Sequence, residues 1–379
     1  MIIIFSGSIG RFPVGGHAWI NMQYLIGLRE LGHEVYYLEE CGDESWVYNW
    51  EAQQLTTELD YPTSYVRACL ETAGLADRWI YRAGEQSVGM KVEDFRDVCS
   101  QAALLLVHAV PIPLWRPEYL LPRRRAFIDT DPGFIQMSLE KGAPLLKQTV
   151  DRCESLFTVG QRIGAHDCLI PSAGRRWGKT VPPVALSHWP PIDDIGSGDF
   201  TCVLQWRGFR DEVYRGVTYG QKDREFPRFI DLPRMTSQPI RIALTGAGED
   251  RLAPYGWRVE EGWSASRTPS AYRDFIRNSR AEFSVAKHGY VKMQGGWFSD
   301  RSVCYLASGR PVLVQDTGLA DWLPTGKGVV PFRDVEQAVA GIAEINQNYD
   351  EHRACARSIA EEYFATGSVL PPLVSEAVD

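Results

Sequence analysis

A glycine-rich loop, followed by a short helix, constrains this chain more than any other stretch. Gly295-Gly296 leads to residues 300–308, whose pattern predicts a helix that Ser299 caps and Gly309 ends. An apolar run at 281–285 predicts a buried strand before the loop. The loop therefore brings backbone N–H groups to a helix start at the carboxyl end of a strand, which suits an anion such as a diphosphate.

Several side chains around this loop suit the same ligand. Asp300 lies in the first turn of the predicted helix, and Arg301 adds a positive charge with a two-pronged donor. Lys287, just after the strand, is a rival ligand of the diphosphate. Glu282 has a carboxylate that can accept two ribose hydroxyls. The alternatives are a glycine turn that joins two core elements and, for Glu282, an edge polar residue.

Further candidates follow other predicted strands of the same half. The segment Asp316-Thr317-Gly318 comes after strand 311–315, where a carboxylate can bind sugar hydroxyls. Arg207 ends strand 200–205, and Lys222 follows a Gly-Gln turn. Such a basic pair can neutralise a leaving diphosphate without a metal ion. The alternative is an ordinary solvated arginine and lysine.

The N-terminal end repeats the alternation of strand and helix. An apolar strand at 1–5, a glycine loop, a helix at 17–31 and a strand at 34–38 predict a doubly wound parallel sheet. The loop lacks the G-x-G-x-x-G fingerprint of dinucleotide-binding proteins. We expect residues 45–100 to be mixed, with a helical tendency. Other apolar runs predict strands at 103–108, 124–129, 155–159, 241–245 and 328–332.

The length of 379 residues fits two domains. We place an N-terminal Rossmann-like domain at 1–188 and a C-terminal one at 198–360, with residues 361–379 as a terminal helix. The linker is marked by Gly196-Ser197-Gly198 and by four prolines, Pro182, Pro183, Pro190 and Pro191.

Composition excludes several classes of function. A net charge of −8 argues against nucleic acid as the main partner, and no apolar run reaches membrane-spanning length. Met1 to Phe5 fit a first strand better than a signal peptide. The eight cysteines are scattered without a C-x-x-C pair, which is typical of reduced thiols in a cytoplasmic protein.

At both ends the sequence resembles the GT-B class of glycosyltransferases, and in its last third a bacterial branch of sugar transferases related to the spore-coat type. The segments that carry the resemblance are Gly15-Gly16-His17, Gly32-His33-Glu34-Val35, Trp297-Phe298-Ser299-Asp300-Arg301, Leu306-Ala307-Ser308-Gly309-Arg310-Pro311-Val312, Asp316-Thr317-Gly318 and Leu323-Pro324-Thr325-Gly326.

The resemblance implies two Rossmann-like domains that face a central cleft, with the last helix crossing back to the first domain. The C-terminal domain would bind a sugar nucleotide, such as a UDP-sugar, and the N-terminal domain the acceptor. In the inverting branch a histidine at the place of His17 is the general base. The alternatives are a glycine loop in which Gly16 contacts phosphate, and a histidine at a helix start that only contacts solvent. The retaining branch carries two glutamates where this chain has Gly296 and Cys304, which favours inversion.

Asp129-Thr130-Asp131 is a D-x-D motif after a predicted strand. In the other large glycosyltransferase class such a motif holds a divalent metal ion. We expect instead that Asp131 or Asp129 lies at the cleft as a base or an acceptor contact, and that no metal or cofactor is used. The alternative is a carboxylate pair in a turn with no role in chemistry.

The sequence thus predicts a metal-independent glycosyltransferase, similar to hexosyltransferases. It would move a sugar from a nucleoside-diphosphate sugar to a hydroxyl or amine of a small-molecule or glycan acceptor, and a homodimer is its candidate assembly. The alternatives are a sugar-nucleotide epimerase on the same fold and a non-catalytic partner protein that binds sugar nucleotides.

Overall fold

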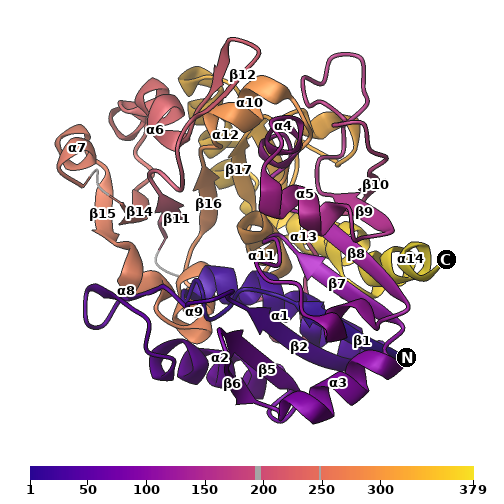
Figure 1. The fold of residues 1–379 in the computed structure, drawn as a ribbon. Coiled ribbons are helices and arrows are strands. Elements are labelled where there is room, and N and C mark those ends of the chain that lie inside the picture. Colours follow the sequence, from indigo (N-terminus) through magenta and orange to yellow (C-terminus); the bar gives the residue numbers. More distant parts are fainter. Residues whose placement is uncertain (193–197, 247–248) are drawn as a thin grey trace.

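The computed structural model describes residues 1–192, 198–246 and 249–379 and contains two large sheets (Figure 1). The first sheet has the strand order β10-β9-β8-β7-β1-β2-β5-β6, and only the pair β5–β6 is antiparallel. Its strands are β1 (Ile2–Ser6), β2 (Glu34–Glu40), β5 (Trp79–Ala83), β6 (Gln86–Gly89), β7 (Leu104–His108), β8 (Arg124–Asp129), β9 (Ser155–Thr158) and β10 (Gly178–Lys179).

Helices cover both faces of this sheet because its strands are apolar on both sides. Along β1, Ile3 and Phe5 join the core on one face, whereas Ile4 joins the core on the other. The helices are α1 (Gly15–Glu30), α2 (Asp60–Thr72), α3 (Val92–Gln101), α4 (Phe134–Glu140) and α5 (Pro144–Val150), and a hairpin of β3 (Val47–Asn49) and β4 (Gln54–Thr56) stands beside them.

The second sheet has the order β15-β14-β11-β16-β17-β18, and all its pairs are parallel. Its strands are β11 (Phe200–Gln205), β14 (Ile240–Thr245), β15 (Arg258–Glu261), β16 (Ala281–Ser284), β17 (Val312–Gln315) and β18 (Val329–Phe332), with a separate hairpin of β12 (Glu212–Tyr214) and β13 (Val217–Tyr219). The helices of this half are α6 (Lys222–Glu225), α7 (Glu249–Leu252), α8 (Gly262–Ser266), α9 (Pro269–Arg277), α10 (His288–Met293), α11 (Asp300–Ala307), α12 (Val335–Gln347) and α13 (Tyr349–Ile359).

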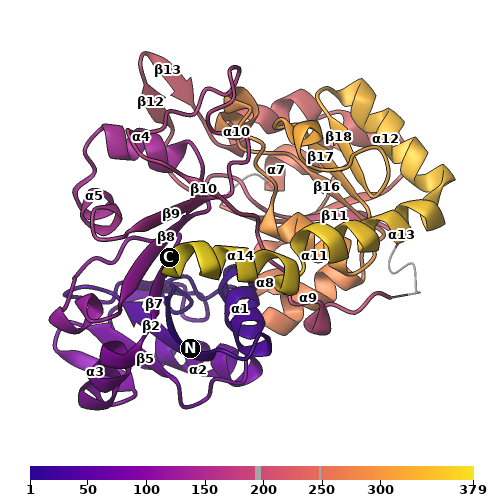
Figure 2. The ribbon, with the colours of Figure 1, turned by 90° about the vertical axis from the view of Figure 1, so that its right-hand side faces the viewer.

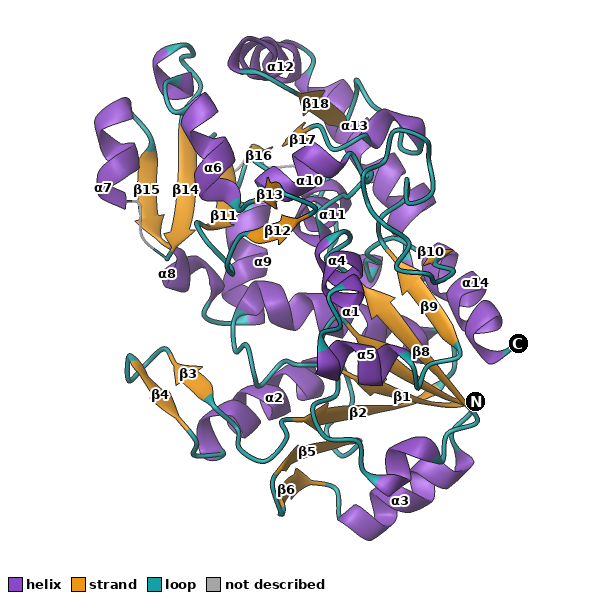
Figure 3. Ribbon diagram, turned by 45° about the horizontal axis from the view of Figure 1, so that its top comes forward, coloured by secondary structure: helices purple, strands orange, loops and turns teal. Residues whose placement is uncertain are grey.

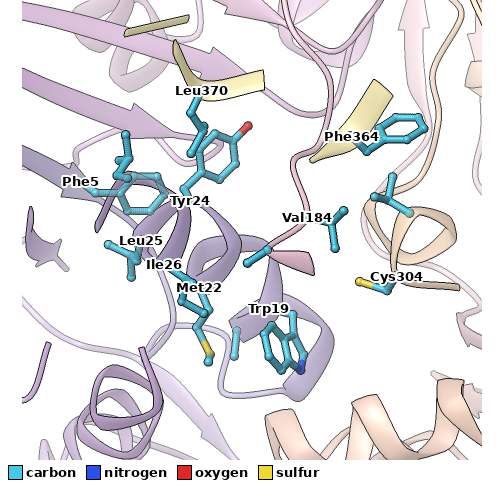
Figure 4. Close-up of a cluster of buried hydrophobic side chains, with 14 of the residues drawn as sticks. Phe5, Trp19, Met22, Tyr24, Leu25, Ile26, Val184, Cys304, Phe364 and Leu370 are labelled. Carbon is cyan, nitrogen blue, oxygen red and sulfur yellow. The ribbon is translucent and has the colours of Figure 1, made fainter. Parts of the chain in front are cut away.

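The last helix, α14 (Thr366–Val378), returns to the first half and lies along α1 and β8 (Figure 2). Gly27 permits this contact, since a Cβ added there would lie 2.4 Å from Thr366 Cγ2 and 2.7 Å from Leu370 Cδ1. Leu370 of α14 and Tyr24 of α1 lie close together in the core (Figure 4). Two Rossmann-like halves with a terminal helix that crosses back were predicted, and the fold confirms both.

The region 45–100 is mixed, as predicted, with α2 and α3 as its helices, but its strands β3, β4, β5 and β6 were not predicted individually. Strand β5 is buried along its whole length, but Arg82 interrupts its apolar pattern. That guanidinium is buried because it pairs with Glu118 at 3.0 Å, a partner distant in sequence.

The division at 1–188, 198–360 and 361–379 stays a prediction. Within the linker, Gly196 and Ser197 lie outside the described residues, whereas the four prolines lie inside them. Among the helices that the structure describes, none is both long and apolar enough to span a membrane.

Candidate functional site

A cleft of about 630 Å³ opens between the two halves. Helices α1 and α11 lie between the two sheets (Figure 3), and both contribute lining residues. Other lining residues lie at or just after the carboxyl ends of strands, among them His108 as the last residue of β7, Asp131 after β8 and Lys287 after β16. Ligands of open parallel sheets bind at such ends, so the cleft has the expected place for a substrate site.

The cleft brings together eight of the thirteen site residues that the sequence predicted. They are Gly16, His17, Asp131, Lys222, Lys287, Ser299, Asp300 and Arg301. The other five, Arg207, Glu282, Asp316, Thr317 and Gly318, do not line it.

Lys222 is a cation of this cleft that has no counter-charge in contact. No hydrogen bond or ion pair joins its amine to any residue that the structure describes. Burial, together with repulsion from Arg301, lowers the pKa of Lys222 to about 8. A desolvated ammonium of this kind attracts an anion strongly, because little water screens it.

Lys287 and Asp131 form an ion pair across the cleft. Lys287 Nζ lies 2.6 Å from Asp131 Oδ1, and the hydroxyl of Tyr290 donates to the same oxygen. Although burial opposes ionisation of Asp131, Lys287 and the two hydrogen bonds hold the pKa of its carboxyl below the usual value. Asp131 is therefore a weak base while this bridge is intact.

His17, at the start of α1, is neutral near pH 7. Burial lowers its pKa to about 4, and its Nε2 lies 2.8 Å from Ser8 Oγ. The ring of Phe12 packs edge-on against it at 5.0 Å between centroids. A neutral, positioned imidazole at a cleft can accept a proton from a substrate hydroxyl. The backbone N–H of Gly16 donates to Ser266 Oγ at 3.2 Å, and its alternative role as a phosphate contact stays a prediction.

Arg301 has a different role from the one predicted. Its Nε donates to Glu282 Oε1 at 2.6 Å, and its Nη atoms donate to the Val203 carbonyl and to Ser284 Oγ. Three of its five N–H groups are thus used inside the protein. It still lines the cleft, but its charge is offset by Glu282.

The prediction that Glu282 binds a ribose is wrong, because its carboxylate is completely buried and pairs with Arg301. A strand residue with an apolar neighbour on each side gives no sign of this pairing. The guanidinium arrives from α11, which lies beyond a loop in the sequence.

Ser299 and Asp300 begin α11 at the cleft as predicted. Ser299 Oγ accepts from the Arg301 N–H at 3.3 Å, so it caps the helix. Burial raises the pKa of Asp300 to about 6, and Arg301 partly opposes that rise. A carboxylate repels a diphosphate but accepts hydrogen bonds from hydroxyls, so Asp300 suits a sugar better than a phosphate.

The segment Asp316-Thr317-Gly318 supports the glycine-rich loop from outside the cleft, which corrects its predicted role. Asp316 accepts from the N–H groups of Gly318 and Leu319 and pairs with Arg333 at 2.8 Å. Thr317 donates to the Trp297 carbonyl at 2.6 Å. Their polar groups are used in fixing the loop that starts α11.

Arg207 also lies outside the cleft, again unlike the prediction. It is half exposed and pairs with Asp211 and Asp223, which neutralise its charge. Its neighbours Gly208 and Phe209 line the cleft instead.

The D-x-D motif is not arranged as a pair of metal ligands. Asp129 is fully buried, and its oxygens accept from the Asp131 N–H, Gln136 Nε2 and Thr158 Oγ1. Within the described part of the chain, no group of three or more His, Cys, Asp or Glu residues is placed to hold a metal ion.

The two positions of the retaining glutamates have different surroundings. Gly296 has φ +70, and a Cβ there would lie 3.0 Å from Arg162 Cγ and 3.1 Å from Trp322 Nε1, so a glutamate would be strained and its neighbours would have to shift. Cys304 lines the cleft and accepts a long hydrogen bond of 3.7 Å from Gln23. Neither position supplies a carboxylate.

Aromatic and polar residues of the cleft escaped the sequence analysis. Trp50 of the first half stacks on Trp263 of α8, with centroids 5.3 Å apart and planes at 12°, and Tyr290 stacks on Trp297 at 4.2 Å. His108 and Tyr24 also line the cleft. Of these residues, only His108 could have been recognised from the sequence, because it is a polar residue at the carboxyl end of a buried strand.

Comparison with known proteins places this arrangement among glycosyltransferase folds. Residues 225–366 match a family described as glycosyl transferase-like. No curated protein matches the sequence.

Two solved structures are similar over nearly the whole chain. An alpha-glucosyltransferase in complex with UDP has a TM-score of 0.60 at 11% identity, covering 100% of this chain and 99% of that one. HepE of Anabaena in complex with UDP-glucose has a TM-score of 0.59 at 11% identity, covering 99% of both chains. The chain therefore has the GT-B fold.

Proposed function

We propose that this chain, with its GT-B fold and its glycosyl transferase-like segment 225–366, transfers a sugar from a nucleoside-diphosphate sugar to an acceptor hydroxyl. The observation that carries the proposal is Lys222, an ammonium without a counter-charge in a cleft between two Rossmann-like halves. An anionic ligand would supply that counter-charge.

Lys222 and the start of α11 are the diphosphate site in this proposal. The helix start offers backbone N–H groups, and Arg301 beneath it adds positive potential although Glu282 offsets its charge. Lys287 joins this site when it leaves Asp131. These groups stabilise the negative charge that develops on the leaving diphosphate, which is the task of Mg²⁺ in metal-dependent transferases.

His17 is the base in this proposal, and Asp131 faces the acceptor. His17 takes the proton of the acceptor hydroxyl as its oxygen bonds to the anomeric carbon, and the diphosphate leaves with the electron pair of the broken bond. With a pKa of about 4, His17 is also a weak base, but it is preferred to Asp131 because no ion pair holds its ring, whereas Lys287 holds Asp131. Asp300 accepts hydrogen bonds from sugar hydroxyls.

The similar structures guide the choice of ligand. One contains UDP and another UDP-glucose, so UDP and UDP-glucose are the first donors to test. The alpha-glucosyltransferase has also been solved with UDP and DNA. For this chain a net charge of −8 opposes a DNA acceptor, so we propose a small molecule or a glycan.

Thermal unfolding with UDP, GDP, ADP, CMP and dTDP, with and without EDTA, tests the donor site. UDP is expected to raise the melting temperature by mass action, with no effect of EDTA. Lys222→Ala should weaken UDP binding at least tenfold, whereas Lys147→Ala, an exposed lysine outside the cleft, should not. Equal UDP binding by both variants would overturn the site, and loss of the effect with EDTA would overturn metal independence.

Product analysis with UDP-glucose and a panel of sugar acceptors then separates the functions. Release of UDP together with a new glycoside supports transfer. An epimerised UDP-sugar in the absence of acceptor supports the epimerase, and unchanged UDP-glucose supports a binding protein.

A further inference from the structure

Three side chains that line the cleft, those of Tyr24, His108 and Gln221, have buried polar atoms without a hydrogen-bond partner among the described residues, and the first two lie side by side. Both ring nitrogens of His108 and the hydroxyl of Tyr24 are buried without one. Each side chain is 1% exposed, and both residues line the cleft. Burying a polar group without a partner destabilises a fold, so the presence of two in one place points to a ligand.

Packing fixes the positions of both rings. The ring of His108 lies 4.8 Å from that of Tyr24 and 5.3 Å from that of Phe5, measured between centroids. Phe5 also stacks on Tyr24 at 5.5 Å, as Figure 4 shows for these two side chains. The pair is therefore held in place before any ligand arrives, which reduces the entropy lost on binding.

The backbone next to His108 is strained. Ala109 has φ +60, a left-handed conformation that residues other than glycine rarely adopt. Its N–H nevertheless donates to the Ile128 carbonyl at 2.9 Å, and Ala109 also lines the cleft. Strain of this kind is typical of binding and catalytic sites, where the surrounding structure maintains it.

Both groups are uncharged. Burial lowers the pKa of His108 to about 3, helped by repulsion from His17, so its ring has one N–H donor and one nitrogen acceptor. Burial, together with the charge of Asp300, raises the pKa of the Tyr24 hydroxyl, which likewise can donate and accept. A phosphate or carboxylate only accepts, and an ammonium only donates. A hydroxyl does both, so it is the group that matches.

We propose that Tyr24 and His108 form a subsite for an uncharged, hydroxyl-bearing ring, that is, a neutral sugar. The subsite rests on the proposed function for its place in the reaction, because both the acceptor and the sugar of the donor have this chemistry. It selects against charged sugars such as uronic acids and amino sugars.

Stability of the free protein gives the first test, which needs no ligand. Tyr24→Phe and His108→Phe remove unpartnered polar atoms, so the melting temperature should stay equal or rise. Tyr37→Phe and His352→Phe are matched controls that should lower it. The Tyr37 hydroxyl bonds to Glu39 and to the Ile9 N–H, and His352 Nδ1 accepts from the Gly328 N–H. If Tyr24→Phe and His108→Phe lower the melting temperature as much as the two control variants do, the proposed subsite is overturned.

Sugar binding gives the second test. Glucose, galactose, mannose and N-acetylglucosamine are titrated against wild type and both variants by calorimetry, beside glucuronate and glucosamine. At least one neutral sugar should bind wild type and bind Tyr24→Phe or His108→Phe at least tenfold more weakly. Equal binding by wild type and variants, or preference for the charged sugars, would overturn the proposal.

UDP and UDP-glucose distinguish the two sources of the sugar. If the donor's sugar occupies the subsite, both variants lose any preference for UDP-glucose over UDP. If the acceptor occupies it, that preference remains while binding of the free sugar weakens. Failure of UDP to bind wild type would reject the proposed function alone, since the free sugars still report on the subsite.

Discussion

Lys287 of the second half reaches across the cleft to Asp131 of the first, with 2.6 Å between Nζ and Oδ1. The two residues follow the carboxyl ends of β16 and β8, which belong to different sheets. Lys287 also lies over the ring of Phe209, 4.3 Å from its centroid. A diphosphate in the cleft would compete with Asp131 for this ammonium, so donor binding and the freedom of Asp131 are linked.

Asp131→Asn is expected to strengthen UDP binding a few-fold, because it removes the carboxylate that competes for Lys287. Lys287→Ala should weaken UDP binding about tenfold, in line with the loss of one charge-assisted hydrogen bond. Isothermal titration calorimetry of both variants measures the effects. Weaker UDP binding by Asp131→Asn would show that the pair does not oppose the donor.

UDP affinity should fall at alkaline pH through Lys222. Its pKa is lowered to about 8, so the amine is charged below that pH and loses its proton above it. Because the diphosphate needs the charged form, affinity should decrease about tenfold per pH unit above about 8 until the pKa of the complex is reached. Lys222→Arg keeps its charge and should give a flat profile between pH 7 and 9.5. If UDP affinity falls in the same way for Lys222→Arg, a group other than Lys222 causes the pH dependence.

The acid limb of the pH–rate profile should identify the base. With a pKa of about 4, His17 can accept a proton at any pH above about 4. Asp300, whose pKa is about 6, would lose its function as a base below about pH 6. Consumption of UDP-glucose should therefore fall only below about pH 4 to 5, and His17→Ala should lower kcat by roughly 10²- to 10⁴-fold. A limb near pH 6 that disappears in Asp300→Asn would make Asp300 the base.

Gly27→Ala should destabilise the protein by about 1–3 kcal/mol, the usual range for an overpacked core. The new Cβ would lie 2.4 Å from Thr366 Cγ2 and push α14 away from α1. In an open helix this substitution normally stabilises by about 0.5–1 kcal/mol. Gly367→Ala is the control, since nothing lies within 4 Å of its added Cβ. Chemical denaturation measures both, and equal stability of Gly27→Ala and wild type would contradict the tight contact.

Local patterns were sufficient for most strands of the two sheets and for the start of the site, whereas β5, β6, β10 and β15 were not predicted. The apolar runs of β1, β7, β14 and β17 mark strands because parallel sheets bury both faces. Ser299 caps α11 as its place before a helical pattern predicts. His17 and Lys222 reach the cleft because each begins a helix, α1 and α6, on its own side of it.

Long-range pairing decided which charges remain for a ligand. The sequence predicted that Arg301, Arg207 and Glu282 bind the sugar nucleotide. In the structure, Glu282 pairs with Arg301, and two aspartates pair with Arg207. A sequence shows which groups carry charge, but the partner of each depends on which elements the fold brings within a few ångströms.

The sequence by itself determined the two-sheet architecture, because hydrophobic periodicity, caps and glycine turns act over a few neighbouring residues. Only the tertiary structure decided that Lys222 stays without a counter-charge and that Tyr24 and His108 share one buried place. Electrostatic and hydrogen-bond satisfaction depend on distances across the whole molecule, and these exist only once the two halves and α14 have packed together.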